Sequence, residues 1–197
     1  MMNRMGSLLA PHRPRPAQGR LQRPPPLLGI DPGLRRTGYA VLGVSAAGDR
    51  CRVIEAGVVR LEAGQAIEQR LAELDRSLAA LLEAHRPDVL VCEQLYAHYK
   101  HPRTAILMAH ARGVILALAA RHGLSVISVG ATQVKKYLTG SGRAGKCQIQ
   151  RAIAATLRLP RLPQPHDVAD ALAVALCGWH VRAARSRLDG RSRRAQR

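Results

Sequence analysis

Apolar and polar positions along residues 27–61 predict three short strands. An apolar run at 27–31 ends at Pro32-Gly33, and a second run covers residues 39–44. Residues 51–61 alternate apolar and polar side chains with the period of a strand. Because the connections between these runs are short, the three strands are expected to form an antiparallel meander.

The period then changes to that of a helix over residues 66–85, with apolar side chains on one face and charged side chains on the other. His85-Arg86-Pro87 ends this helix. Residues 88–93 are an apolar run bounded by charges, which is typical of a buried central strand. A strand, a helix and a strand in this order predict a parallel crossover.

The rest of the chain continues as alternating helices and strands. Residues 103–121 form an Ala-rich helix in which Gly113 is expected to permit close packing, and a fifth strand follows at 124–129. Two helices at 131–138 and 146–157 flank a glycine-rich loop, and a last helix runs from about 167 through 185. The predicted fold class is therefore α/β, a five-stranded mixed sheet flanked by helices.

This pattern divides the chain into one domain and two extensions. The domain spans residues 27–180, long enough to bury a core without disulfides or structural metals. Residues 1–26 are rich in Arg and Pro and are expected to be a disordered extension, with a transit peptide as the alternative. Residues 181–197 are expected to be a basic, Arg-rich tail.

Composition adds a polyanionic partner. Lys and Arg number 31 against 13 Asp and Glu, a formal net charge of +18. More than half of it lies in the tails, with five Arg and no acid in residues 1–26 and seven Arg and one Asp in residues 180–197. Such a balance favours nucleic acid or an anionic membrane surface, although it also fits a solvated surface.

Cysteines and apolar runs bear on the compartment. The four cysteines lie far apart and form no C-x-x-C pair, which argues against a zinc ribbon and for a reducing, cytoplasmic location. No stretch reaches the roughly 18 uninterrupted apolar residues that a membrane span needs. The protein is therefore expected to be soluble, with no membrane partner.

Four carboxylates stand at positions where they could form one catalytic site. Asp31 ends the first strand, Glu93 ends the buried fourth strand, and Asp167 and Asp170 lie three apart on one face of the last helix. If the first and fourth strands are neighbours, these acids meet at one end of the sheet. Asp167 alone has an ordinary alternative role, because carboxylates are favoured at helix N-termini in any protein.

Such a cluster would repel itself unless it held cations. Carboxylate oxygens suit Mg²⁺ or Mn²⁺, and two ions about 4 Å apart would activate a water and stabilise the leaving oxygen of a phosphodiester. The sequence therefore predicts metal-dependent hydrolysis of nucleic acid.

Six short motifs resemble the RuvC family of Holliday-junction resolvases, in the family's order and with similar spacing from about residue 28 to 180. They are Gly29-Ile-Asp-Pro-Gly33, Thr37-Gly-Tyr39, Cys92-Glu-Gln-Leu95, Ala111-Arg-Gly-Val114, Gln133-Val-Lys135 and Asp167-Val-Ala-Asp-Ala-Leu-Ala173. The resemblance implies a ribonuclease H-like fold, a homodimer, and two Mg²⁺ per subunit. It also implies paired symmetrical nicks in four-way junction DNA during recombination and repair, and partnership with RuvA and RuvB.

The same resemblance assigns roles to single residues. Asp31, Glu93, Asp167 and Asp170 occupy the positions of the family's catalytic acids. Lys135 and Lys146 come with their motifs and are expected to contact DNA phosphates, with simple solvation as the alternative. A flexible glycine-rich loop precedes Lys146, and Arg143 in that loop adds charge for the same contact. Tyr96 stands where the family commonly has an aromatic residue thought to stack on an unpaired base. His166 is either an acid–base group or a partly exposed neighbour of the acids.

Other functions stay open. Residues 140–146 fit G-x-x-x-x-G-K, but Cys147 replaces the hydroxyl residue of a nucleotide-binding loop and the preceding segment is predicted to be helical. A ribonuclease H-like nuclease acting on another nucleic acid keeps the metal ions and changes the substrate. A non-catalytic basic DNA-binding protein would show no cutting with any metal.

Overall fold

The computed structural model describes residues 24–95 and 102–195. Its strands and helices are β1 (Leu27–Asp31), β2 (Arg36–Val44), β3 (Cys51–Arg60), α1 (Ile67–His85), β4 (Val89–Glu93), α2 (Pro102–Arg121), β5 (Ser125–Val129), α3 (Ala131–Thr139), α4 (Lys146–Leu157) and α5 (His166–Ala195).

The five strands form one mixed sheet in the order β3-β2-β1-β4-β5. β1, β2 and β3 pair antiparallel, while β4 pairs parallel with both β1 and β5. The predicted meander and the predicted parallel crossover are both confirmed. Because β1 and β4 are neighbours, with Ile30 opposite Cys92, their carboxyl ends lie side by side.

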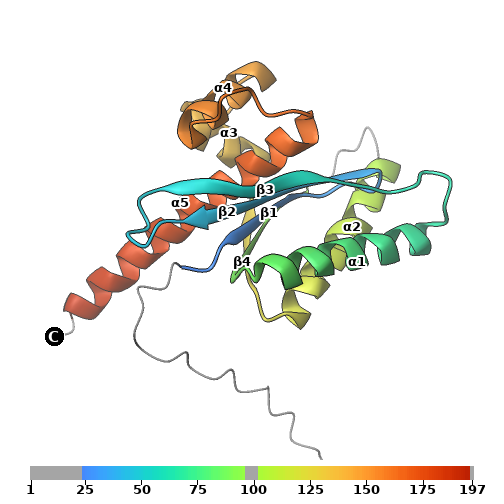
Figure 1. Cartoon of the computed structure of the whole chain (residues 1–197), viewed down its shortest axis with the longest axis horizontal. Helices are drawn as coiled ribbons and strands as arrows, with labels where there is room; N and C mark the ends of the chain where they lie inside the picture. The colour runs from blue at the N-terminus through green and yellow to red at the C-terminus, as the bar shows by residue number, and fades with distance from the viewer. Residues whose placement is uncertain (1–23, 96–101, 196–197) are drawn as a thin grey trace, which may run out of the picture.

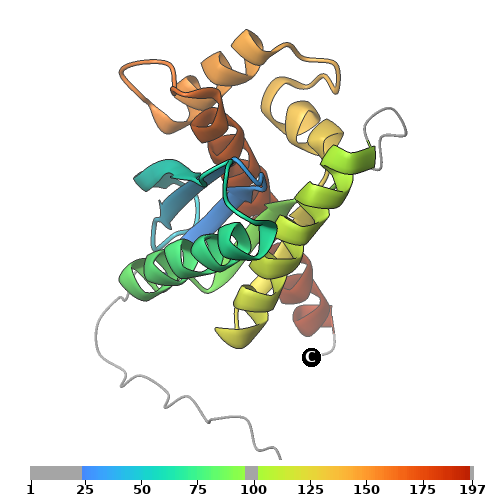
Figure 2. The ribbon, with the colours of Figure 1, turned by 90° about the vertical axis from the view of Figure 1, so that its right-hand side faces the viewer.

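Helices cover both faces of the sheet. In Figure 1, α5 crosses one face with α3 and α4 beside it, and α1 and α2 lie on the other face. Figure 2 shows the same layers from a second direction. Successive side chains on a strand point to opposite faces, so Leu27 joins the apolar cluster under α5 and Leu28 the cluster under α1 and α2.

Helix α1 follows directly from its sequence pattern. Leu74, Leu78 and Leu82 are buried at four-residue spacing, and each buried leucine contributes about 1.5–3 kcal/mol. The helix ends where Arg86 adopts a left-handed conformation and its N–H donates to the carbonyl of Leu82, just before Pro87.

Helix α5 lies unusually close to the sheet. Its residues 171–178 are buried without interruption. A Cβ on Gly29 would overlap Ala175, and a Cβ on Gly38 would overlap the backbone oxygen of Asp167. Glycines in the sheet therefore allow the first turn of α5 to rest against the end of β1.

Helix α5 also continues beyond its predicted end near residue 185, as far as Ala195. The expected tail at 181–197 is thus largely helical. One reason is local, since Arg and Ala are strong helix formers. The other is a tertiary contact: Arg182 pairs with Asp88 at 2.9 Å, which ties this part of the helix to the start of β4. The domain boundary at residue 180 stays a prediction.

Helix α2 leaves an apolar face uncovered. Residues Arg103–Arg121 have a mean hydropathy of 1.3, and by length and composition alone this stretch passes a test for a membrane span. Ile106 is 57% exposed, and within the described residues nothing lies within 4 Å of a Cβ placed on Gly113. No other part of the described chain packs closely on Gly113, so the expectation of close packing at this glycine stays a prediction that only a partner could fulfil.

Candidate active site

The sheet brings Asp31 and Glu93 together. Both stand at the carboxyl ends of neighbouring parallel strands, and the residues just before them, Ile30 and Cys92, are paired in register. The Asp31 carboxyl and the Glu93 carboxylate share a hydrogen bond. This hydrogen bond adds to the rise in the pKa of Asp31 and opposes the rise in the pKa of Glu93.

Helix α5 adds the third carboxylate. Asp170 lines a cavity of about 180 Å³ together with Asp31 and Glu93. Ala173 and Val174, one turn further along the helix, form its apolar wall. The close approach of α5 to the sheet therefore places three acids from three elements around one small cavity.

Asp167 occupies a different position from the other three acids. Its carboxylate lies 3.8 Å from the Arg36 guanidinium, and it is absent from the lining of the cavity. Its charge still acts on Asp31, whose pKa it raises. Asp167 and Asp170 thus share a helix face as predicted, with Asp170 inside the cavity and Asp167 on its rim.

Burial and mutual repulsion disfavour the ionised carboxylates. The pKa of Asp31 rises to about 8, first because of burial and then because of the charges of Glu93, Asp170 and Asp167. Burial likewise raises the pKa of Glu93 and of Asp170. A cation in the cavity would remove this repulsion.

Two lysines and a histidine offset part of the negative charge. Lys135 of α3 lies on the cavity wall and lowers the pKa of both Glu93 and Asp170. Lys146, the first residue of α4, and His166 also lower the pKa of Asp170. The structure therefore brings Lys135 and Lys146 to the acids.

The other two predicted DNA contacts are Arg143 and Tyr96. Arg143 is exposed in the loop between α3 and α4, where its backbone N–H donates to the Ser141 hydroxyl at 3.3 Å. Tyr96 lies outside the described residues. The segment before residues 140–146 is helix α3, as predicted. A nucleotide-binding loop follows a strand instead, so this context argues against one.

A turn after β1 holds Asp31 in place. The fully buried Thr37 hydroxyl donates to the Gly33 carbonyl at 2.5 Å and accepts the Gly33 N–H at 3.2 Å. Arg70, reaching up from α1, donates to the Leu34 carbonyl. Thr37 belongs to one of the sequence motifs, but nothing in the sequence pattern indicated Arg70.

Arg112 of α2 holds the end of β4. Its Nε donates to the Glu93 carbonyl at 3.1 Å and its Nη2 to the Ser128 hydroxyl at 2.9 Å. The Gln94 N–H donates to the Val129 carbonyl at 2.8 Å. Arg112 belongs to the Ala111-Arg-Gly-Val114 motif, but its link to Glu93 could be seen only in the fold.

Gln150 of α4 fixes the segment that leads into α5. Its buried amide donates to the Pro163 carbonyl at 3.0 Å and lies 3.5 Å from His166 Nδ1. This contact sets the place of the first turn of α5, which carries His166 and Asp167.

The carboxylates suit a hard divalent cation by their chemistry. Oxygen ligands of net negative charge are what Mg²⁺ and Mn²⁺ prefer. Across residues 24–95 and 102–195, no three Asp, Glu, His or Cys side chains already stand as a metal shell. Because the pKa of Asp31 is raised, binding of a cation by both Asp31 and Glu93 would release a proton.

Comparison with protein families identifies the family to which the chain is similar. Residues 27–178 match the family model described as Crossover junction endodeoxyribonuclease RuvC. A protein of that name from Rhodopirellula baltica is 48% identical over 155 residues, which is 79% of this chain and 86% of the relative. Another from Pelotomaculum thermopropionicum is 41% identical over 154 residues, covering 78% and 92%.

Solved structures give the same answer for the fold. The RuvC structure from Thermus thermophilus superposes with a TM-score of 0.73 at 28% identity, covering 81% of this chain and 96% of that one. The T. thermophilus RuvC in complex with a Holliday junction substrate gives 0.71 at 26% identity, covering 80% and 96%. The predicted ribonuclease H-like architecture is thereby confirmed.

Proposed function

The chain belongs to the RuvC family of crossover junction endodeoxyribonucleases, and from that premise we propose that its carboxylate cavity cuts Holliday junctions with bound Mg²⁺. The observation that carries this proposal is the meeting of Asp31, Glu93 and Asp170 around one cavity with raised pKa values. The reaction is phosphodiester hydrolysis, with paired symmetrical nicks in two strands of the junction.

In this proposal the acids divide the work. Asp31, Glu93 and Asp170 would hold two Mg²⁺ ions per subunit, with Mn²⁺ as a substitute. Asp167, beside Arg36 at the edge of the cavity, would be the fourth ligand. Bound divalent ions supply an activated water and stabilise the leaving oxygen. Lys135, on the cavity wall, is placed to hold a phosphate oxygen close to the acids.

The DNA strand approaches over basic residues around the cavity. Arg36 is 59% exposed beside Asp167, and Lys146 and Arg143 are exposed in and after the α3–α4 loop. Cations near an acidic cavity attract the phosphate backbone and make binding depend on salt. Arg36 thus joins the four DNA-contact residues proposed from the sequence, which are Tyr96, Lys135, Arg143 and Lys146.

We also propose that two copies form a homodimer through α2. Ile106 is exposed, and Ala109, Gly113 and Leu116 line a hollow of about 380 Å³ beside Gln94 and Leu95. Apolar surface of this kind is typically covered by a partner. A second copy fits the reaction, because symmetrical nicks in two strands need two cavities related by a two-fold axis.

Partnership with RuvA and RuvB and a cytoplasmic location belong to the same proposal. Both follow from the family resemblance, and four free cysteines in the described residues agree with a reducing compartment.

The test is cutting of a synthetic four-way junction with Mg²⁺ by the intact chain and by Asp31→Asn. Removing even an outer partner of a metal site costs about 10- to 100-fold, so losing a ligand should cost at least that much while junction binding persists. Glu83→Gln, an exposed acid on α1, is the matched control and should cut normally.

Three results would count against the proposal. Cutting by Asp31→Asn at the normal rate would remove the metal site. Preference for an RNA–DNA hybrid over the junction would point to another ribonuclease H-like nuclease. Binding without cutting by the intact chain, with either metal, would indicate a DNA-binding protein alone.

A further inference from the structure

A second and larger hollow lies at the opposite end of the sheet from the carboxylates. It has a volume of about 780 Å³ and lies among the β2–β3 turn, the end of α4 and the middle of α5. Trp179 in its lining follows Asp170 by nine residues on α5, roughly 13 Å along the helix axis. The hollow shares no lining residue with the carboxylate cavity.

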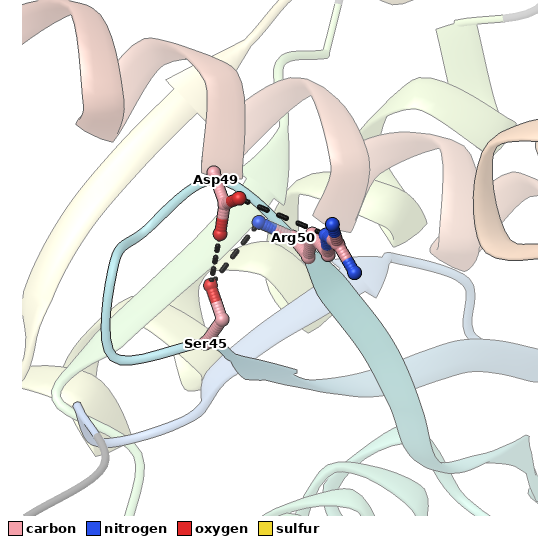
Figure 3. Close-up of polar contacts among 3 residues, drawn as sticks. All are labelled: Ser45, Asp49 and Arg50. Atoms are coloured by element: carbon pink, nitrogen blue, oxygen red, sulfur yellow. Dashed lines mark hydrogen bonds and ion pairs between the residues drawn. The ribbon is translucent and has the colours of Figure 1, made fainter.

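The β2–β3 turn forms one wall that is already ordered by its own hydrogen bonds (Figure 3). The Ser45 hydroxyl donates to Asp49 at 2.7 Å and accepts the Arg50 N–H at 3.2 Å. The Ser45 N–H donates to the Arg50 carbonyl at 2.9 Å. A wall fixed before binding lowers the entropy that a ligand must overcome.

The rim of the hollow is basic. Arg50 is 79% exposed, and Arg158 is exposed at the end of α4, where its backbone is left-handed with φ of 53°. Asp49, the one acid of the lining, is bonded to Ser45 and lies 3.7 Å from Arg50 Nε. No carboxylate of the described residues pairs with Arg158.

The floor of the hollow is apolar. Val44, Cys51, Leu157 and Trp179 contribute to it. The Trp179 Nε1 is buried and has no acceptor among the described residues. Because Nε1 itself is inaccessible to solvent, Trp179 offers a ligand in the hollow the apolar surface of its ring.

We propose that this hollow binds an acidic peptide segment of another protein. An apolar side chain of the peptide packs on Leu157 and Trp179, and its carboxylates pair with Arg50 and Arg158. Apolar anchors inside a charged rim are the usual arrangement of peptide-binding sites.

Charge and shape exclude the other candidates for this place. The chain's own ends are basic, with five Arg and no acid in residues 1–23 and four Arg and one Asp in residues 189–197. Duplex DNA presents phosphates on a convex surface and is contacted by protruding side chains, whereas this hollow is concave with an apolar floor. An acidic peptide satisfies both the rim and the floor.

The experiment titrates the full chain with a short fluorescein-labelled peptide of Asp and Glu around one Leu-Phe pair, followed by anisotropy. Trp179 is the only tryptophan, so its emission reports on the hollow directly and should change on binding. The double variant Arg50→Gln/Arg158→Gln should bind at least about tenfold more weakly, because it loses two charge-assisted contacts.

Arg76→Gln/Arg86→Gln is the matched control, since it removes the same charge elsewhere. Arg86 has the same left-handed position at the end of α1 that Arg158 has at the end of α4. This control should leave peptide affinity unchanged. Trp179→Phe, which keeps an aromatic side chain but removes part of the indole surface on which the peptide packs, should weaken peptide binding while junction cutting stays normal.

Four outcomes would overturn the proposal: no peptide binding to the intact chain, equal weakening by the two double variants, equal binding of a peptide with Ser-Ser in place of Leu-Phe, or loss of junction affinity in Arg50→Gln/Arg158→Gln. The last would assign the hollow to nucleic acid. Since junction cutting is measured on the same variants, failure here is distinguishable from failure of the nuclease proposal.

Discussion

At the scale of single residues, Asp31 carries conflicting demands. It is partly buried, it faces three other acids, and its pKa rises to about 8. Without a cation the raised pKa favours the protonated Asp31 carboxyl, while metal binding requires the ionised form. Asp31 therefore lowers the stability of the metal-free fold, and it does so at a position where the proposed metal site needs a carboxylate.

This destabilisation predicts how stability depends on pH. The folded-state pKa of Asp31 is raised above its ordinary value of 3.8, so the stability present at low pH is lost as the pH rises from about 4 through about 8. Asp31→Asn should flatten this decline and raise the Tm at pH 8 in EDTA, by roughly 2–4 °C per kcal/mol regained.

Thermal unfolding at pH 5 and pH 8, with EDTA and with Mg²⁺, measures this effect. Mg²⁺ should raise the Tm of the intact chain at pH 8 and leave Asp31→Asn unchanged. An identical decline in both proteins would show that Asp31 does not titrate in this range.

Arg112 predicts a positioning effect at the same scale. Arg112→Met removes the hydrogen bonds to the Glu93 carbonyl and the Ser128 hydroxyl but keeps the packing of the side-chain stem. Cutting should fall about 10- to 100-fold and the Mg²⁺ concentration for half-maximal rate should rise. Arg103→Met, exposed on the same helix, should change neither, and unaltered Mg²⁺ dependence in Arg112→Met would contradict the role.

At the scale of elements, the fit of α5 against the sheet sets the geometry of the site. Asp167 and Asp170 reach the end of β1 only because Gly38 leaves room for the first turn of the helix. The interpretation of α5 from sequence was right for its start and wrong for its end, since helix propensity and the Arg182–Asp88 pair continue it to Ala195.

Gly38→Ala should push this turn away from β1. Overpacking of this kind costs about 1–3 kcal/mol, and the shifted acids should lower cutting at least about tenfold. Junction cutting and thermal unfolding measure the two effects. Gly64→Ala, in an open loop, should be neutral in both, and full activity of Gly38→Ala would mean that the helix adjusts without moving its acids.

At the scale of the whole molecule, the uncovered apolar face of α2 is the proposed dimer interface. Ile106→Glu should shift a dimer toward monomer in sedimentation, because a charge on an apolar interface is costly to bury. Ile54→Glu, on the opposite edge strand β3, is the control and should leave the dimer intact. An unchanged dimer in Ile106→Glu would place the interface elsewhere.

Local patterns in the sequence determined much of this molecule. The apolar runs and their ends placed Asp31 and Glu93 at strand termini, and helical spacing placed Asp167 and Asp170 on one face. These features depend on residues near each other in the chain, where the periods of strand and helix act directly.

Only the tertiary structure decided which of these groups meet. It set β1 beside β4, turned Asp170 into the cavity and Asp167 toward Arg36, and brought Lys135, Arg70 and Arg112 to the site. It also joined the β2–β3 turn, α4 and Trp179 into the second hollow. The physical reason is that such contacts link residues far apart in sequence, and packing of the two apolar layers against the sheet determines them.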